Sequence, residues 1–504
     1  MVSEKNRKWW VLGALAVSLL TVGLDITVLN LALPTLASKM HATNSELQWF
    51  ADAYNLVIAS LLLPAGLLGD KLGRKKMLLI ALLIFGIASM ICAFSDTPNQ
   101  LIVGRLLLGL GAAFLLPLSM SIIPVLFTEE ERSKAIGIWV MANFLGIPLG
   151  PILGGWLLKN YWWGSVFLIN LPIILIGIVA IFFLLKESKS TDRIKVDYLG
   201  TLLSSIGMIA LTYGFIEVGE RGWSNMIAMG SMFGGLAILI LFILWERKVE
   251  HPLIDLKLFK SSSFTWGSIL ATIVSFAMFG LLFVLPQYLQ AVGGYDTLGT
   301  GLRLLPIVGG LLVGAKLVDV LKKLSPKAIF VIGFLLLVIG LVIGSNTSLT
   351  DGYGFACIWI SIVGLGIGLI LPTAMDVSMS ALSPERSGIG SAIIMTLRQI
   401  GGTIGIAILG SMLSVVYRDK LYVEGLPSDA VDLVERNVSS GVAVAQNLKS
   451  TPLLDSVRGA FVHGMDTLLW VCAGVTVFGM ILTLVCLRLP RNEKEGQSKN
   501  VIRS

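Results

Sequence analysis

Apolar stretches of roughly 20 residues recur along the whole chain and are separated by short polar segments. A helix of that length spans about 30 Å, which is the thickness of the hydrocarbon core of a bilayer. The pattern therefore predicts an all-α integral membrane protein with fourteen transmembrane helices. The predicted spans cover about residues 10–33, 47–68, 77–95, 100–125, 135–158, 164–185, 199–218, 226–245, 265–289, 300–319, 328–345, 354–375, 388–414 and 467–487.

Composition supports this class. Of the 504 residues, 55% are hydrophobic and only 14% are charged, whereas a soluble domain carries about 25% charged residues. The four cysteines lie apart within apolar stretches, and the three histidines are far from one another. This spacing argues against a disulfide framework or a zinc site. We expect no metal and no cofactor.

The charges predict an orientation in the membrane. The net charge is +7, and most of the 38 Lys and Arg residues lie in alternate loops. By the positive-inside rule these loops are cytoplasmic. We therefore expect a multi-pass protein of the cell inner or plasma membrane with both termini in the cytoplasm. The basic start of the chain leads into a retained first span, since it has no convincing cleavage site. This distribution favours lipid over nucleic acid as the partner of the charges.

Two sequence patterns occur twice, each time eight spans apart. Gly69–Lys76 follows the second span, and the weaker counterpart Val318–Leu324 follows the tenth. Gly146–Gly155 lies in the fifth span, and Gly401–Gly410 lies in the thirteenth. Internal repeats are typical of transporters, which place the substrate site between the repeats. The repeats predict two six-helix bundles with two extra helices between them.

Three regions follow from this arrangement. They are an N-terminal six-helix bundle, two inserted transmembrane helices with a cytoplasmic linker, and a C-terminal six-helix bundle, at residues 1–190, 191–260 and 261–504. The last region contains a long extracellular loop at about 415–465. Within it, residues 430–436 and 439–448 could form short amphipathic helices. A solvated cap with no chemistry is the simpler interpretation of this loop.

Seven motifs occur in a characteristic order: Leu24–Pro34, Gly69–Lys76, Arg105 with the small residues that follow it, Gly146–Gly155, Trp163–Pro172, Leu285–Gln290 and Arg398–Gly402. Together they resemble the major facilitator superfamily, specifically its fourteen-span drug/proton antiporters of the QacA/EmrB type. The resemblance implies the major facilitator fold and proton-driven export by alternating access. One departure is Gly164, which stands where the family usually has arginine.

Asp25 is the candidate proton-coupling acid. A carboxylate within hydrocarbon costs several kcal/mol unless it is paired, protonated or facing water. By the helical rise, Asp25, Asp52 and Arg105 all lie roughly 8–12 Å below the outer ends of their spans. Burial disfavours the charged carboxylate and a nearby arginine favours it, so Arg105 can tune Asp25 for uptake and release of protons. A purely structural Asp–Arg pair is the alternative.

A second group of residues is expected to contact substrate. Aromatic rings and a carboxylate suit lipophilic cations through charge pairing and attraction to the ring face. Arg398 lies about 15 Å into the thirteenth span, where a lone arginine requires a cavity or a partner. The alternative is ordinary packing between helices. The candidate substrate-binding residues are Asp52, Tyr54, Asn55, Asn143, Arg398 and Phe279.

The loop after the second span is the candidate conformational gate, with Gly69, Asp70, Gly73 and Arg74. Gly73 permits a tight turn. Asp70 can face the positive N-terminal end of a helix from the other half. Such contacts would hold the cytoplasmic side closed and break as the two halves rock. The positive-inside rule explains the basic residues of this loop but not its glycines and its aspartate.

The fifth span carries small residues at close spacing together with prolines. Small residues allow close approach of helix backbones, and proline favours a bend. In the family that this chain resembles, the block marks exporters more than importers. Its residues here include Gly146, Gly150, Pro151, Gly154 and Gly155.

These observations predict a proton-driven antiporter that exports drug-like compounds and acts as a monomer. Some related exporters have further acids in the tenth and thirteenth spans, whereas the matching stretches of this chain, residues 305–310 and 393–399, have none. Lipophilic neutral or monovalent cationic compounds therefore fit better than divalent cations. A specific metabolite or ion exporter of the same fold is the alternative. Neither a nucleophile–base pair nor an ATP-binding loop is evident in the sequence, which argues against an enzyme.

Overall fold

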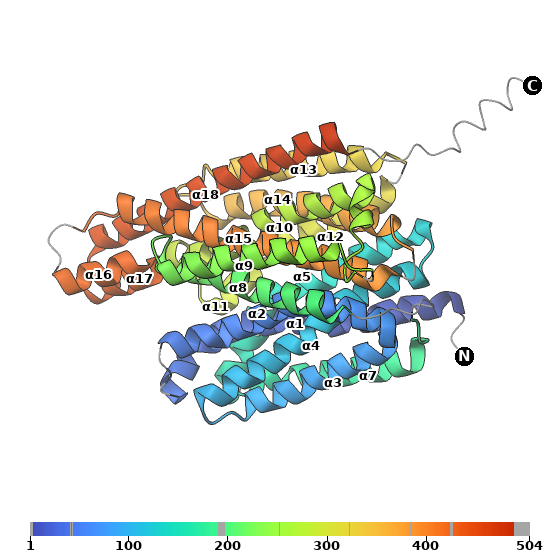
Figure 1. The fold of residues 1–504 in the computed structure, drawn as a ribbon. Coiled ribbons are helices and arrows are strands. Elements are labelled where there is room, and N and C mark those ends of the chain that lie inside the picture. Colours follow the sequence, from blue (N-terminus) through green and yellow to red (C-terminus); the bar gives the residue numbers. More distant parts are fainter. Residues whose placement is uncertain are drawn as a thin grey trace, which may run out of the picture.

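The computed structural model describes residues 4–40, 42, 44–189, 197–250, 252–321, 323–383, 386–423 and 427–487. Every regular element in these ranges is a helix (Figure 1). Fourteen helical segments of the described chain are long and apolar enough to cross a membrane. The predicted all-α class and number of spans are therefore confirmed. The predicted boundary at residues 190 and 191, residues 1–3 and residues 488–504 lie outside the described residues.

Along the chain the helices form three successive groups, and the bounds of the three predicted regions stay a prediction. The first group is α1 (Glu4–Met40), α2 (Asn44–Leu72), α3 (Arg74–Ala93), α4 (Pro98–Leu126), α5 (Glu129–Asn160), α6 (Ser165–Leu168) and α7 (Asn170–Leu184). The inserted helices are α8 (Tyr198–Arg221) and α9 (Met226–Glu246). The last group is α10 (Ser262–Gln287), α11 (Thr297–Arg303), α12 (Leu305–Val320), α13 (Pro326–Gly344), α14 (Tyr353–Ser380), α15 (Ser387–Lys420), α16 (Ser428–Arg436), α17 (Val438–Asn447) and α18 (Thr451–Cys486).

Several helices extend well beyond the predicted spans. The region predicted as a long loop at 415–465 is shorter, because α15 continues to Lys420 and α18 begins at Thr451. Hydropathy marks only the part of a helix that lies in hydrocarbon, whereas the helix itself extends to a capping residue. For α18 this residue is Ser450, whose hydroxyl accepts from Leu453 N at 3.4 Å. The two short helices expected in this loop are present as α16 and α17.

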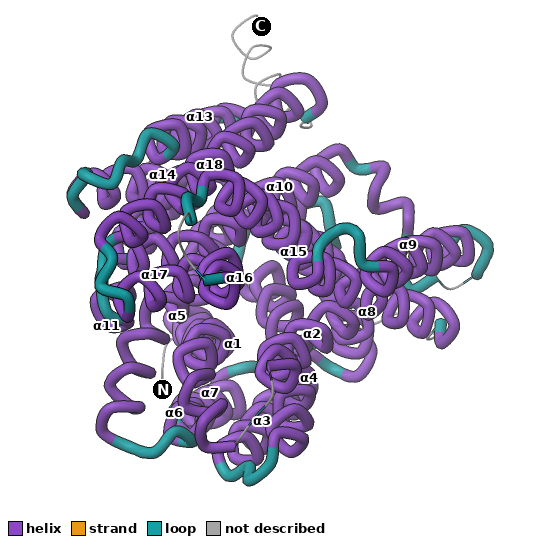
Figure 2. Tube along the Cα trace, turned by 90° about the vertical axis from the view of Figure 1, so that its left-hand side faces the viewer, coloured by secondary structure: helices purple, strands orange, loops and turns teal. Residues whose placement is uncertain are grey.

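Figure 2 shows how the groups are arranged. Helices α1 to α7 lie on one side and α10 to α18 on the other, with α8 and α9 at the edge where α2 and α15 meet. Helix α8 packs against α9, α2 and α15. Helix α9 exposes large apolar side chains, among them Phe233, Ile240 and Leu244. Exposure of such residues along a helix is expected for a face toward lipid.

The repeat seen in the sequence is also a repeat of packing. In the first half, the glycine-rich face of α5 lies on α1, and Gly146 contacts the backbone at Gly23. In the second half, the glycine-rich face of α15 lies on α10, and Gly405 contacts the backbone at Phe276. In each half, therefore, the fifth membrane helix uses small residues to approach the first.

The two halves meet through α2 and α4 against α15, and through α5 against α11, α12 and α14. We call the end of the molecule that carries the loops with Lys71, Arg74 and Arg132 the basic end. Sequence analysis predicts that this end is cytoplasmic. With an even number of spans, α1 begins and α18 finishes at this same end, which lies on the right in Figure 1.

Candidate transport site

Close packing of α1 and α5 positions Asp25. A side chain at Gly150 would collide with Thr27 Oγ1, and one at Gly154 would lie 3.1 Å from Val28 Cγ1. Thr27 Oγ1 also donates to Gly146 O at 3.3 Å. Helix α1 is therefore seated against the glycine face of α5, while its Asp25 carboxylate reaches Arg105 on α4.

Asp25 and Arg105 form a buried ion pair. Their exposed fractions are 3% and 1%. Arg105 Nη1 donates to Asp25 Oδ2, and Arg105 Nε donates to Phe50 O of α2 at 2.6 Å. Asp25 Oδ1 is buried and accepts no hydrogen bond from any described residue. The pair thus links α1, α2 and α4 while one carboxylate oxygen remains open to a proton.

Tyr54 belongs to the same cluster. Its ring lies 4.6 Å from the guanidinium carbon of Arg105, and its hydroxyl donates to Val22 O of α1 at 3.5 Å. The side chain is fully buried. The structure therefore brings Tyr54 together with Asp25 and Arg105, and its assignment as a substrate contact stays a prediction.

Asp70 connects the two halves at the basic end. It accepts from Gly388 N at 3.1 Å and from Ile389 N at 2.9 Å, at the first turn of α15. Arg74 donates to the same carboxylate from Nε at 3.0 Å and from Nη2 at 2.6 Å. We call Asp70, Arg74 and the first turn of α15 the basic-end latch. The predicted contact of Asp70 with a helix N-terminus of the other half is present, and its role as a gate stays a prediction.

Two glycines make the latch possible, although the segment predicted as a loop is almost entirely helical, because α2 continues to Leu72 and α3 begins at Arg74. Gly73 has φ +110°, a conformation that side chains disfavour. A side chain at Gly69 would collide with Leu118 of α4. Glu187 lies beside this turn and accepts from Lys75 N and Lys76 N, both at 3.0 Å. The turn thus directs the chain from α2 into α3 and leaves Asp70 facing α15.

Other contacts close the same end. Ser387 Oγ donates to Ser121 O at 2.9 Å, and Ser391 Oγ donates to Pro117 O at 2.7 Å, which fixes α15 to α4. Between α5 and α14, Arg132 Nε lies 3.6 Å from Asp376 Oδ1. At the opposite end, a side chain at Gly301 of α11 would lie 2.9 Å from Pro151 Cβ of α5. The two halves are therefore in contact at both ends.

The remaining predicted substrate residues are dispersed. Asp52 and Asn55 lie on α2, Asn143 lies on α5, and all three are partly buried. Phe279 of α10 packs against Gly402 of α15, where a side chain would lie 2.7 Å from its ring. The assignment of these four residues and of Arg398 as substrate contacts stays a prediction.

Arg398 of α15 is buried, with 7% of its surface exposed. Its Nε donates to Ser275 Oγ of α10 at 3.2 Å, and its Nη1 donates to Met395 Sδ at 3.4 Å. Among the described residues, no carboxylate lies within ion-pair distance of it. Arg398 thus faces a neighbouring helix with two neutral partners.

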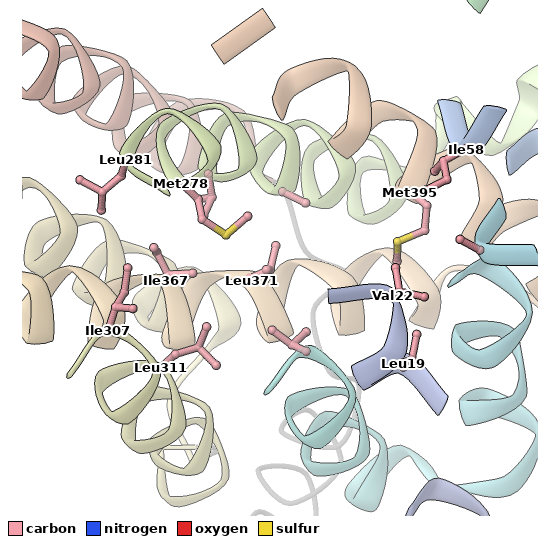
Figure 3. Packing of buried hydrophobic residues seen from close by; sticks show 14 of the residues in the cluster. Leu19, Val22, Ile58, Met278, Leu281, Ile307, Leu311, Ile367, Leu371 and Met395 are labelled. Atoms are coloured by element: carbon pink, nitrogen blue, oxygen red, sulfur yellow. The ribbon is translucent and has the colours of Figure 1, made fainter. Parts of the chain in front are cut away.

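A narrow apolar cavity lies between the halves near their centre, and Figure 3 shows part of its wall. Its lining residues come from α5, α10, α12 and α14: Pro148, Met278, Leu282, Ile307, Val308, Leu311 and Ile367. None of these was predicted from the sequence. An apolar residue on a membrane helix has the same sequence pattern whether it faces lipid, a neighbouring helix or a cavity.

Sequence reasoning also missed Glu187 and Ser275. Their roles depend on contacts with residues more than 100 positions away. A serine within one span and an acid just after another have no distinctive sequence pattern that would mark those contacts.

The chain is similar to known proteins over most of its length. A profile described as Major Facilitator Superfamily matches residues 15–406. The multidrug efflux pump LfrA of Mycolicibacterium smegmatis is 33% identical, over 91% of this chain and 92% of that protein. The tetracenomycin C resistance and export protein of Streptomyces glaucescens is 28% identical, over 97% of this chain and 94% of that protein.

Among solved structures, the proton:xylose symporter XylE has a TM-score of 0.63 and 14% identity, over 96% of this chain and 97% of that chain. This likeness concerns the fold alone. The predicted fold of two six-helix bundles with two extra helices is therefore confirmed as a transporter fold.

Proposed function

The chain belongs to the major facilitator superfamily, and from this premise we propose that it is a proton-driven antiporter that exports drug-like compounds by alternating access. Its relatives are named as exporters of drugs or antibiotics. The family and the fold indicate that the protein is a multi-pass transporter and not an enzyme. The proton coupling, the direction of transport and the substrate class are the proposal.

The observation that carries the proposal is the ion pair of Asp25 with Arg105. Both groups are buried within membrane-spanning helices, where ionisable residues are rare and mark ion pathways. Protonation of the open oxygen Asp25 Oδ1 would neutralise the carboxylate and free Arg105 from its charged partner. The link between α1 and α4 would then weaken, which couples proton binding to a change in helix packing.

The basic-end latch supports the alternating-access part of the proposal. A carboxylate bound to backbone N–H groups at a helix N-terminus is a strong, directional contact. Its loss would allow α2 and α4 to separate from α15 at the basic end. Contacts of α5 with α11 at the opposite end would hold that end closed while the basic end is open. Lipophilic neutral or monovalent cationic compounds remain the proposed substrates, and a specific metabolite or ion exporter remains the alternative.

The test is transport by purified protein in proteoliposomes under an imposed proton gradient. We expect gradient-driven transport to fall at least tenfold in Asp25→Asn, while the exposed-site control Asp96→Asn transports like the wild type. Full gradient-driven transport by Asp25→Asn at a normal protein level would show that Asp25 does not couple the proton. A panel of neutral, cationic and metabolite substrates separates the multidrug proposal from the specific exporter.

A further inference from the structure

The charge of Arg398 has no anionic counterpart in the described part of the protein. Its two hydrogen-bond acceptors are a serine hydroxyl and a thioether. A buried guanidinium with only neutral partners is costly, because burial removes hydration and nothing of opposite charge replaces it. A mid-membrane arginine of this kind attracts anions and disfavours cations nearby.

Arg398 is also close to the apolar cavity. Ser275, which accepts from Arg398, lies three residues before Met278 on α10, a separation of about 4.5 Å along the helix. Met278 lines the cavity. The guanidinium therefore lies roughly one helical turn from this small apolar space, which has a volume of about 20 Å³ and is lined by six residues of the second half and by Pro148 of the first.

The interface between the halves lies next to Arg398 as well. Met395, whose sulfur accepts from Arg398, is packed toward Val22 of α1 (Figure 3). Asp25, three residues after Val22, is neutralised by Arg105. Met395 therefore brings the helix that carries Arg398 next to a part of the first half whose acid, Asp25, is already paired.

We propose that Arg398 and the cavity together form a binding site for amphipathic monoanions, such as lipophilic carboxylic acids. The acid group binds to Arg398 and the apolar body enters the cavity when the halves move apart. Guanidinium binds carboxylate through two parallel hydrogen bonds, which neither a neutral amide nor an ammonium group can reproduce. This inference rests on the proposed export function, but it takes the substrate class from Arg398, and amphipathic monoanions thereby replace the monovalent cations named above.

The alternative is a structural role in which Arg398 only joins α15 to α10. The two roles differ in their effect on ligand choice. A structural arginine would change the binding of all compounds of equal size alike, whereas a recognition group would change only the binding of the acid.

The experiment compares three probes that share one apolar body: 1-naphthylacetate, 1-naphthylacetamide and 2-(1-naphthyl)ethylammonium. Their dissociation constants are measured by calorimetry with the purified full chain in lipid nanodiscs, without a proton gradient. The wild type is expected to bind the carboxylate at least tenfold more tightly than the amide, and the ammonium compound most weakly. Equal affinities, tightest binding of the ammonium compound or no binding of any probe would overturn the inference.

Variants identify the residue. Arg398→Gln is expected to reduce carboxylate affinity to the level of the amide and to leave amide affinity unchanged. Arg398→Lys should retain part of the preference, since it keeps the charge but loses the planar fork. Leu311→Trp, which fills the cavity, should weaken the carboxylate and the amide alike. Preserved carboxylate preference in Arg398→Gln, or an equal loss for the carboxylate and the amide, would assign Arg398 a structural role only.

The proposed proton coupling is tested separately. Asp25→Asn should keep the carboxylate preference in this binding assay even though it loses gradient-driven transport. A failure of proton coupling therefore leaves the binding result intact, and a failure of anion binding leaves the coupling result intact.

Discussion

Two buried Asp–Arg pairs in the described part of the chain differ in how completely the aspartate is satisfied. Asp70 uses both oxygens, accepting from Arg74 and from two backbone N–H groups of α15. Asp25 uses one oxygen for Arg105, and the other accepts nothing from the described residues. Asp70 also joins the two halves, whereas the Asp25 pair lies within the first half.

This difference suggests different tasks for the same pair of residue types. A carboxylate with several donors is held firmly in its charged form and suits a mechanical contact. A buried carboxylate with one donor and one open oxygen is easier to protonate and suits a chemical step. Four measurements can break or sharpen this distinction.

Removal of the arginine from each pair should give the largest effect. Arg105→Gln leaves the Asp25 carboxylate without its donor, and breaking a buried pair in this way costs about 3–5 kcal/mol. Arg74→Gln should cost clearly less, because Asp70 keeps its two backbone donors. The measurement is the midpoint of thermal unfolding in detergent. The double variant Asp25→Asn/Arg105→Gln should recover part of the loss, and equal losses for the two arginine variants would remove the distinction.

The seat of α1 on α5 should be the next most sensitive feature. Gly150→Ala would press a methyl group into Thr27 and shift the helix that carries Asp25, at a cost of about 1–3 kcal/mol. Gly230→Ala in α9 is the matched control, since nothing lies within 4 Å of an added Cβ there. Thermal unfolding and gradient-driven transport should both fall for Gly150→Ala only. Unchanged values for Gly150→Ala would show that this contact does not position Asp25.

Loss of the Asp70 charge in the basic-end latch should shift the balance between closed and open conformations moderately. Asp70→Asn removes the charge that binds Arg74 and the first turn of α15. If this destabilises the closed state by about 1.4 kcal/mol, the closed-to-open ratio falls tenfold. The measurement is the rate of thiol labelling of Ser391→Cys, a buried position at this seam, with the four native cysteines replaced. We expect about tenfold faster labelling in Asp70→Asn and no change in Asp96→Asn. An unchanged rate would contradict the role of Asp70 in closure.

A more exposed Asp–Arg pair at the basic end, Asp255 with Arg386, is expected to contribute least to stability. Asp255 accepts from Arg386 Nη1 at 2.6 Å, but Arg386 is half exposed, so solvent screens the pair. Partial burial raises the pKa of Asp255, yet the Lys257 N–H and Arg386 outweigh it and lower the pKa below its ordinary value of 3.8. A lowered acid pKa adds stability above pH 3.8 that is lost as the pH falls further.

Arg386→Ala should therefore reduce stability by only about 0.5 kcal/mol at pH 7. The difference from the wild type should disappear once Asp255 is protonated, well below pH 3.8. Thermal unfolding at both pH values provides the measurement. A loss at pH 7 as large as that of Arg105→Gln would mean that burial does not govern the strength of these pairs.

Much of the architecture could be predicted from the sequence because the membrane restricts the possibilities. Only closed backbone hydrogen bonding is tolerated in hydrocarbon, so apolar length alone predicts helical spans. The repeated glycine blocks at Gly146–Gly155 and Gly401–Gly410 likewise predicted an internal repeat, while the helices on which they pack, α1 and α10, are known only from the structure. Helix ends were predicted less well, because polar residues outside the hydrocarbon can continue a helix without altering hydropathy.

The candidate site could be predicted only in part. Asp25, Arg105, Asp70 and Arg398 are conspicuous because a charge within an apolar span is costly and therefore rare. Their partners are ordinary groups, such as Phe50 O, the backbone of Gly388 and the hydroxyl of Ser275. No local pattern distinguishes these partners from the many similar groups in the same helices.

The sequence by itself determined the number of membrane spans, the internal repeat and the few ionisable residues that must be paired or functional. The spans and these residues follow from the cost of polar groups in hydrocarbon. The tertiary structure decided which charges are paired, that one oxygen of Asp25 stays open, and that Arg398 lies beside an apolar cavity with only neutral partners. These facts depend on distances between helices far apart in the chain, and such distances are set by packing of whole helix faces and not by local sequence.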